Sequence, residues 1–230
     1  MSQSLLIFLF FFQIVLIYLL SRWVINKLFH FLRIFISDDH LVFSLVSLLF
    51  FPGTIVHEVA HFFAATVLFL RVRSISIFPK WEGREIKLGS VLYEKKDFVR
   101  GLLVGIAPIF AGLLFFWFVA VFNLFPSKSI VLNIVFLYLI FAVSSMMFSS
   151  KRDLVDLIYI FPFLVFLYGF IYIFDLKLDY LIRNEALRET ILNFIKQVNI
   201  YLLISITINV LLLIIFLLLK KLIKRKTSAL

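Results

Sequence analysis

The chain has 230 residues, of which 63% are hydrophobic and 31 are phenylalanine, and its mean hydropathy is +1.12. An apolar share this far above that of a soluble domain argues against a water-soluble protein and indicates several membrane spans. The net charge of +10 lies in short loops and in a tail, beside anionic lipid, so we do not expect nucleic-acid binding. Because the chain has no cysteine, any metal must be held by histidine and carboxylate side chains.

Long apolar runs predict an all-α polytopic membrane protein with about six transmembrane helices and a small β-hairpin at the membrane surface. The first run, Ser4 to Leu20, can cross most of the hydrocarbon core at about 1.5 Å per residue. Basic and aromatic residues from Trp23 to Ile36 predict an amphipathic helix at the interface. The other predicted spans are Leu41–Leu70, Val99–Phe125, Ile130–Phe148, Leu154–Phe174 and Ile200–Leu219.

The second predicted span is longer than one crossing needs, and Pro52-Gly53 divides it. Proline removes a helix hydrogen bond and glycine loosens the backbone, so we expect a kink or a short break there. A new helix is then expected from about Thr54. Breaks of this kind are tolerated at membrane depth where they line a wet cavity or pack against protein.

The helix after this break carries the segment His57-Glu58-Val59-Ala60-His61. Two histidines four residues apart share one helical face and can bind one zinc ion, while Glu58 lies close enough to deprotonate a metal-bound water. Ionisable residues inside a transmembrane helix are costly unless they pair or bind something, so this segment is the main candidate site. The alternative is a hydrogen-bonded histidine pair with Glu58 salt-bridged to an arginine.

The one long polar segment, 71–100, is predicted to form the hairpin. Its strands are expected at Val72 to Phe78 and at Glu85 to Tyr93, with a turn at Glu82-Gly83. An exposed strand edge could pair with an unwound substrate segment, or the hairpin could simply connect two spans. The sequence does not decide between these two roles.

Catalytic zinc usually takes three protein ligands plus water, so the histidine pair requires a third ligand. We predict Asp153, with Asp156 as the alternative, because both are carboxylates at the membrane edge. Ser150 could cap a helix with Asp153 in its first turn, which would keep the aspartate ionised and able to bind a cation. Glu82 and Glu85 rank lower because they fall within the predicted hairpin.

The distribution of basic residues predicts which side of the membrane the loops occupy. Six alternating spans place 15 of the 23 Lys and Arg residues on one side, together with the N-terminus, the hairpin, Asp153 and the basic tail. The positive-inside rule makes this side cytoplasmic. We therefore predict a multi-pass protein of the cell membrane with its site toward the cytoplasm.

The pattern resembles the site-2 protease family of intramembrane zinc metalloproteases, as a divergent or minimal member. In that family an HExxH motif on one transmembrane helix is completed by an aspartate two spans later. The matching positions here are His57, Glu58, His61, Gly105–Pro108 and Ser145–Asp153. The family often has an asparagine eight residues before its aspartate; this chain has Ser145, whose hydroxyl could donate one hydrogen bond in its place.

This resemblance implies Zn²⁺-dependent hydrolysis of peptide bonds in membrane-protein substrates, with Glu58 as the general base. It makes 41–174 the metalloprotease-like transmembrane core. The core follows an anchor and interfacial helix, 1–40, and precedes an amphipathic segment, a last span and a basic tail, 175–230. Two alternatives stay open: a non-catalytic metal-binding scaffold, and a membrane zinc hydrolase with a lipid-like substrate. The oligomeric state is not indicated.

Overall fold

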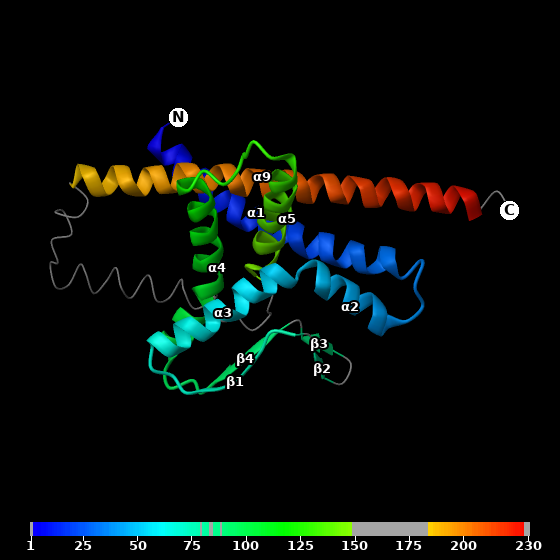
Figure 1. The fold of residues 1–230 in the computed structure, drawn as a ribbon, viewed down its shortest axis with the longest axis horizontal. Coiled ribbons are helices and arrows are strands. Elements are labelled where there is room, and N and C mark those ends of the chain that lie inside the picture. Colours follow the sequence, from blue (N-terminus) through cyan, green and yellow to red (C-terminus); the bar gives the residue numbers. More distant parts are fainter. Residues whose placement is uncertain (1, 79, 83–84, 88, 149–183, 228–230) are drawn as a thin grey trace.

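The computed structural model describes residues 2–78, 80–82, 85–87, 89–148 and 184–227, which are mostly helical (Figure 1). Its helices are α1 (Gln3–Leu32), α2 (Asp39–Leu49), α3 (Phe51–Val67), α4 (Phe98–Val121), α5 (Ile130–Met146) and α9 (Glu185–Thr227). Its strands are β1 (Val72–Ser76), β2 (Lys80–Glu82), β3 (Glu85–Lys87) and β4 (Ser90–Tyr93). The predicted span 154–174 lies outside the described residues.

Short polar side chains mark where four of these helices begin. Ser2, Asp38, Asp97 and Ser129 each accept a hydrogen bond from a backbone N–H in the first turn of the helix that follows. These side chains satisfy N–H groups that have no partner within the helix, which is why Ser and Asp favour this position. The apolar helices therefore start where the sequence supplies a polar cap.

Three of the described helices are long and apolar enough to cross a membrane: α1, α4 and the Glu185–Leu219 part of α9. Helices α2 and α3 would make a fourth span if the bent pair counts as one, and α5 is shorter, with 17 residues. These helices are consistent with the expected membrane protein. The predicted count of six spans is not confirmed by the described part of the chain.

The predicted break in the second span is confirmed. Helices α2 and α3 meet at Phe50 with a bend of 72°. Pro52 lies in the first turn of α3, where its missing N–H costs no helix hydrogen bond. Helix α3 accordingly begins at Phe51, three residues before the predicted start at Thr54.

Helices α1 and α9 are longer than predicted. A span and a separate interfacial helix were expected in 4–36, but α1 is continuous from Gln3 to Leu32. Likewise, residues 185–199 of the charged stretch before the last span belong to the same helix as that span, α9. The reason is that no glycine or proline interrupts either range, so a change from apolar to polar residues alters the helix's surroundings but not its backbone.

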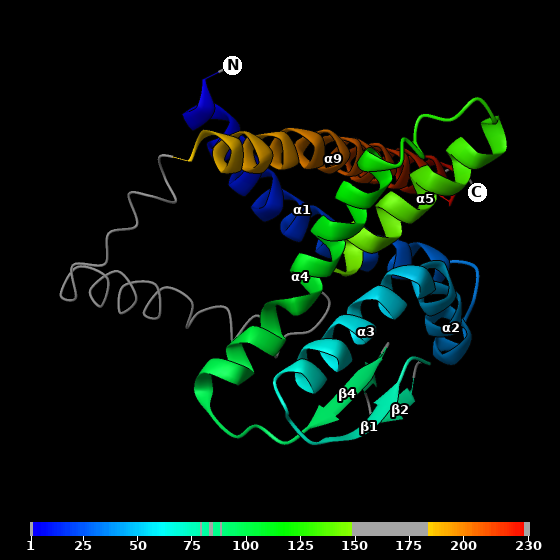
Figure 2. The same cartoon turned by 60° about the vertical axis from the view of Figure 1, so that its left-hand side comes forward.

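These two long helices run in the same direction, contrary to the predicted alternation. The Asn199 side-chain amide donates to the Leu6 carbonyl at 3.2 Å near one end of the pair, and Phe31 packs on Phe216 near the other. Both views show this arrangement, with the two termini at opposite ends (Figures 1 and 2). Six alternating spans would make the first and last helices antiparallel, so the predicted relative direction of these two helices is wrong.

The hairpin forms as predicted, in two antiparallel parts. Strand β1 pairs with β4, and β2 pairs with β3 through Glu82 and Glu85. An ion pair between Arg73 and Glu94, 2.8 Å long, joins its two arms. The hydrogen bond from Arg73 lowers the pKa of the Glu94 carboxyl. The β1–β4 part lies along α3, on the side away from α1 and α9 (Figure 2).

Helix α3 is held on its buried side by neighbours that approach closely. Gly53 lies against α5, and a methyl group at this position would overlap the Ala142 carbonyl oxygen and lie 2.7 Å from Met146 Cγ. Further along, Ala65 and Leu70 pack with Val104 of α4, with Tyr93 of the hairpin against them. Three parts of the chain therefore hold α3 in place along its length.

The contact at Gly53 predicts that G53A destabilises the protein by about 1–3 kcal/mol, since α3 and α5 would have to separate. G101A is the matched control. A methyl group there meets only the flexible end of Lys95, at 2.9 Å, and alanine favours a helix interior. Unfolding in detergent measures both variants; equal stability of G53A and G101A would contradict the close α3–α5 contact.

Candidate metal centre

The predicted motif lies on α3, and its three polar side chains are buried. His57 is 2% exposed, Glu58 5% and His61 7%, although the surrounding protein is strongly apolar. Helical spacing places the two histidines one turn apart on the same face. Buried ionisable groups in such surroundings are retained where they are paired, hydrogen-bonded or bound to a cation.

The two imidazole rings converge through the same nitrogen. His57 Nε2 and His61 Nε2 are 3.1 Å apart, and the ring planes are at 86° to each other. Two nitrogens bound to one tetrahedral zinc ion at about 2.0–2.1 Å are separated by about 3.3 Å. The observed separation is close to this value, so the pair fits two positions of a zinc site without rearrangement of the helix.

A backbone carbonyl of α4 orients His61. The Nδ1 atom of His61 lies 2.9 Å from the Val104 carbonyl oxygen. A carbonyl can only accept, so Nδ1 carries the proton and the Nε2 of a neutral ring offers a lone pair. Metal-binding histidines usually donate their second ring nitrogen in this way. A direct hydrogen bond between the rings would instead require the proton on Nε2 of His57.

The hairpin covers Glu58. A methyl group at Gly89 would lie 2.5–2.8 Å from three side-chain atoms of Glu58, including Oε1. The carboxylate therefore occupies the space that a side chain at position 89 would fill. Since Glu58 follows His57 directly, this contact places the base candidate between the motif helix and the start of β4.

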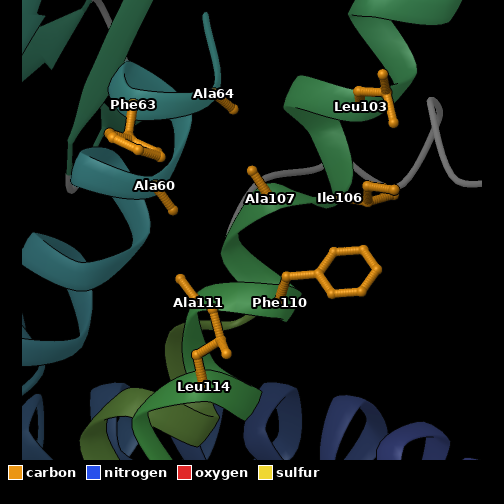
Figure 3. A pocket seen from close by; sticks show the side chains of 9 residues that line it. All are labelled: Ala60, Phe63, Ala64, Leu103, Ile106, Ala107, Phe110, Ala111 and Leu114. Carbon is orange, nitrogen blue, oxygen red and sulfur yellow. The ribbon is translucent and has the colours of Figure 1, made fainter. Parts of the chain in front are cut away.

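An apolar groove lies between α3 and α4 (Figure 3). Its volume is about 250 Å³. The lining residues are Ala60, Phe63, Ala64, Leu103, Ile106, Ala107, Phe110, Ala111 and Leu114. Ala60 belongs to the motif itself, so the groove borders the helix face that carries the histidines. No polar side chain lines it.

The predicted third ligand falls outside the part of the chain that the structure describes. Asp153 and Asp156 lie outside the described residues, and within the described ranges no group of three His, Asp or Glu side chains could hold a metal ion. Glu82 and Glu85 lie in the hairpin, as predicted, rather than on a helix beside the motif; Glu82 is in β2, where a turn was expected, and Glu85 is in β3. The assignment of Asp153 therefore stays a prediction.

Sequence reasoning found the motif residues but missed two of their neighbours. The Val104 carbonyl is a backbone group, so the residue type at position 104 gives no indication that it accepts a hydrogen bond. Gly89 could have been suspected only as a glycine inside a predicted strand. Ser145, expected to donate a hydrogen bond, is buried at 2% exposure, and its hydroxyl has no hydrogen-bond partner among the described residues.

No protein family, curated protein or solved structure matches the chain.

The converging imidazoles predict that H57A and H61A each lose stoichiometric zinc, because one histidine cannot hold the ion at this site. Metal content of the purified full-length protein measures this. H40A is the matched control, because His40 lies at the exposed start of α2 and should leave zinc binding unchanged. Zinc retained by both motif variants would show that the pair is not a metal site.

Proposed function

We propose that the protein is an intramembrane zinc metalloprotease that hydrolyses peptide bonds of transmembrane substrates. The observation that carries this proposal is the set of three buried polar side chains on α3, with the two Nε2 atoms 3.1 Å apart. Such a set inside an apolar bundle has little structural use without a cation. The resemblance of the motif to the site-2 protease family supports the same reaction.

The residues of the chain divide the chemistry between them. His57 and His61 would bind zinc through Nε2, with Asp153 as the third ligand. Bound zinc would act as a Lewis acid that acidifies water and polarises a carbonyl group. Glu58 accepts the proton of the attacking water and then donates it to the leaving amine. The close contact with Gly89 holds the Glu58 carboxylate beneath the hairpin.

The direction of α5 supports Asp153 as the ligand. Helices α3 and α5 run the same way, because Phe50 packs on Phe141 while Gly53, further along α3, packs on Ala142 and Met146. His57 lies one turn beyond Gly53, about 6 Å along the axis. Met146 lies against Gly53, and the five residues from Phe148 to Asp153 can extend about 17 Å, which exceeds the rise of about 6 Å from Gly53 to His57.

The groove between α3 and α4 favours an apolar substrate. All of its lining side chains are nonpolar and one of them, Ala60, belongs to the motif, which suits a transmembrane segment entering from the bilayer. A peptide bond inside a helix is poorly accessible, so such a substrate would unwind locally before cleavage. The same lining would accept an acyl chain, which is the observation in favour of a zinc hydrolase with a lipid-like substrate. A non-catalytic metal-binding scaffold would bind neither a transmembrane segment nor an acyl chain in this groove.

The role of Glu58 predicts that E58Q keeps zinc but loses cleavage of a membrane-protein substrate by about 10²–10⁴-fold, since glutamine cannot accept the proton. Reconstituted protein and a panel of single-span substrates measure cleavage, with metal content measured alongside. E94Q, at the exposed hairpin ion pair, is the matched control and should leave both unchanged. Full cleavage by E58Q would contradict the assigned base.

For the third ligand, we expect D153N to lose zinc affinity by at least about tenfold, while D156N binds zinc as the unmodified protein does. Competition with a chelator of known affinity measures both variants. The reverse order would move the ligand to Asp156. Unchanged affinity in both would remove the carboxylate from the proposed centre.

A further inference from the structure

The acceptor of the His61 hydrogen bond belongs to an unusual turn of α4. Pro108 lies in the interior of this helix and is buried. Proline has no backbone N–H, so the carbonyl four residues before it lacks its usual helix partner. Four residues before Pro108 is Val104, whose carbonyl oxygen lies 2.9 Å from His61 Nδ1.

A free carbonyl at this place needs a donor. Val104 is fully buried at 0% exposure, packed with Ala65 and Leu70, and a buried backbone carbonyl without a partner is strongly unfavourable in apolar surroundings. His61 supplies the hydrogen bond that Pro108 cannot. The proline and the histidine are therefore complementary across the α3–α4 contact.

We propose that Pro108 is a positioning residue for the metal centre: by withholding an N–H group, it reserves the Val104 carbonyl for His61 Nδ1. The ring is thereby held in the Nδ1–H tautomer, with its Nε2 lone pair directed to the point where His57 Nε2 also converges. A residue with an N–H group at 108 would compete for the same carbonyl. A larger fraction of His61 would then carry its proton on Nε2 instead of Nδ1. The inference deepens the proposed function, on which its zinc-binding part rests.

The test compares P108A with the unmodified full-length protein. Alanine supplies the missing N–H. We expect zinc affinity to fall about 10–100-fold, which is the typical effect of removing a group that accepts a hydrogen bond from the second ring nitrogen of a metal-binding histidine. Alanine is much more favourable than proline in a helix interior, so thermal stability should hold or rise. Weaker zinc binding with undiminished stability separates a positioning role from damage to the fold.

The tautomer of His61 gives a second readout that needs no metal. In zinc-free protein, ¹⁵N NMR of the imidazoles distinguishes Nδ1–H from Nε2–H, and the four histidines can be assigned by single substitutions. We expect Nδ1–H in the unmodified protein and a mixture in P108A. P52A is the matched control, because Pro52 lies in the first turn of α3 and its replacement should change neither readout.

Three results decide the inference. Unchanged zinc affinity and an unchanged tautomer in P108A would overturn it, as would Nε2–H on His61 in the unmodified protein, which can be measured even if P108A does not fold. If neither protein binds zinc but the tautomer changes as expected, the link between Pro108 and His61 holds and the proposed function fails.

Discussion

Burial of polar groups in apolar surroundings is the constraint on which the site depends. Each polar atom of the motif has to find a partner within the protein, because neither lipid nor the apolar groove offers one. The Val104 carbonyl meets this need for one nitrogen of His61, and the convergence of the two Nε2 atoms leaves a position for a cation. The packing around α3 keeps the Val104 carbonyl oxygen and the ring nitrogens of His57 and His61 in these positions.

Three parts of the chain hold the motif in place through different contacts. Helix α5 approaches α3 at Gly53, α4 provides the carbonyl, and the hairpin lies over Glu58 at Gly89. The first two contacts fix the helix and one ring, whereas the third covers the carboxylate. Movement of the hairpin would therefore affect Glu58 before it affected the histidines. This division suits a centre in which metal binding and proton transfer belong to adjacent residues.

Much of the site could be predicted because it depends on local spacing. The i, i+4 separation of His57 and His61 fixes a shared helix face, and Pro52 reliably marks the bend before it. The hairpin, too, follows from its strand-forming residues. The hydrogen bond to Val104 could not be predicted in the same way, because it joins two helices through a backbone atom.

The arrangement of the long helices was harder to predict for a related reason. Hydropathy indicates which residues favour lipid, but it does not show whether a helix ends where the apolar run ends, as α1 and α9 demonstrate. Simple alternation then gave the wrong relative direction for these two helices. Their parallel packing depends on contacts such as Asn199 with Leu6, between residues far apart in the sequence.

X-ray absorption spectroscopy of the zinc-loaded full-length protein tests the central claim most directly. The account predicts two imidazole nitrogens and at least one carboxylate oxygen, at about 2.0–2.2 Å, with one imidazole lost in H61A. A zinc ion with no imidazole in its coordination shell, or protein that takes up no zinc, would contradict it.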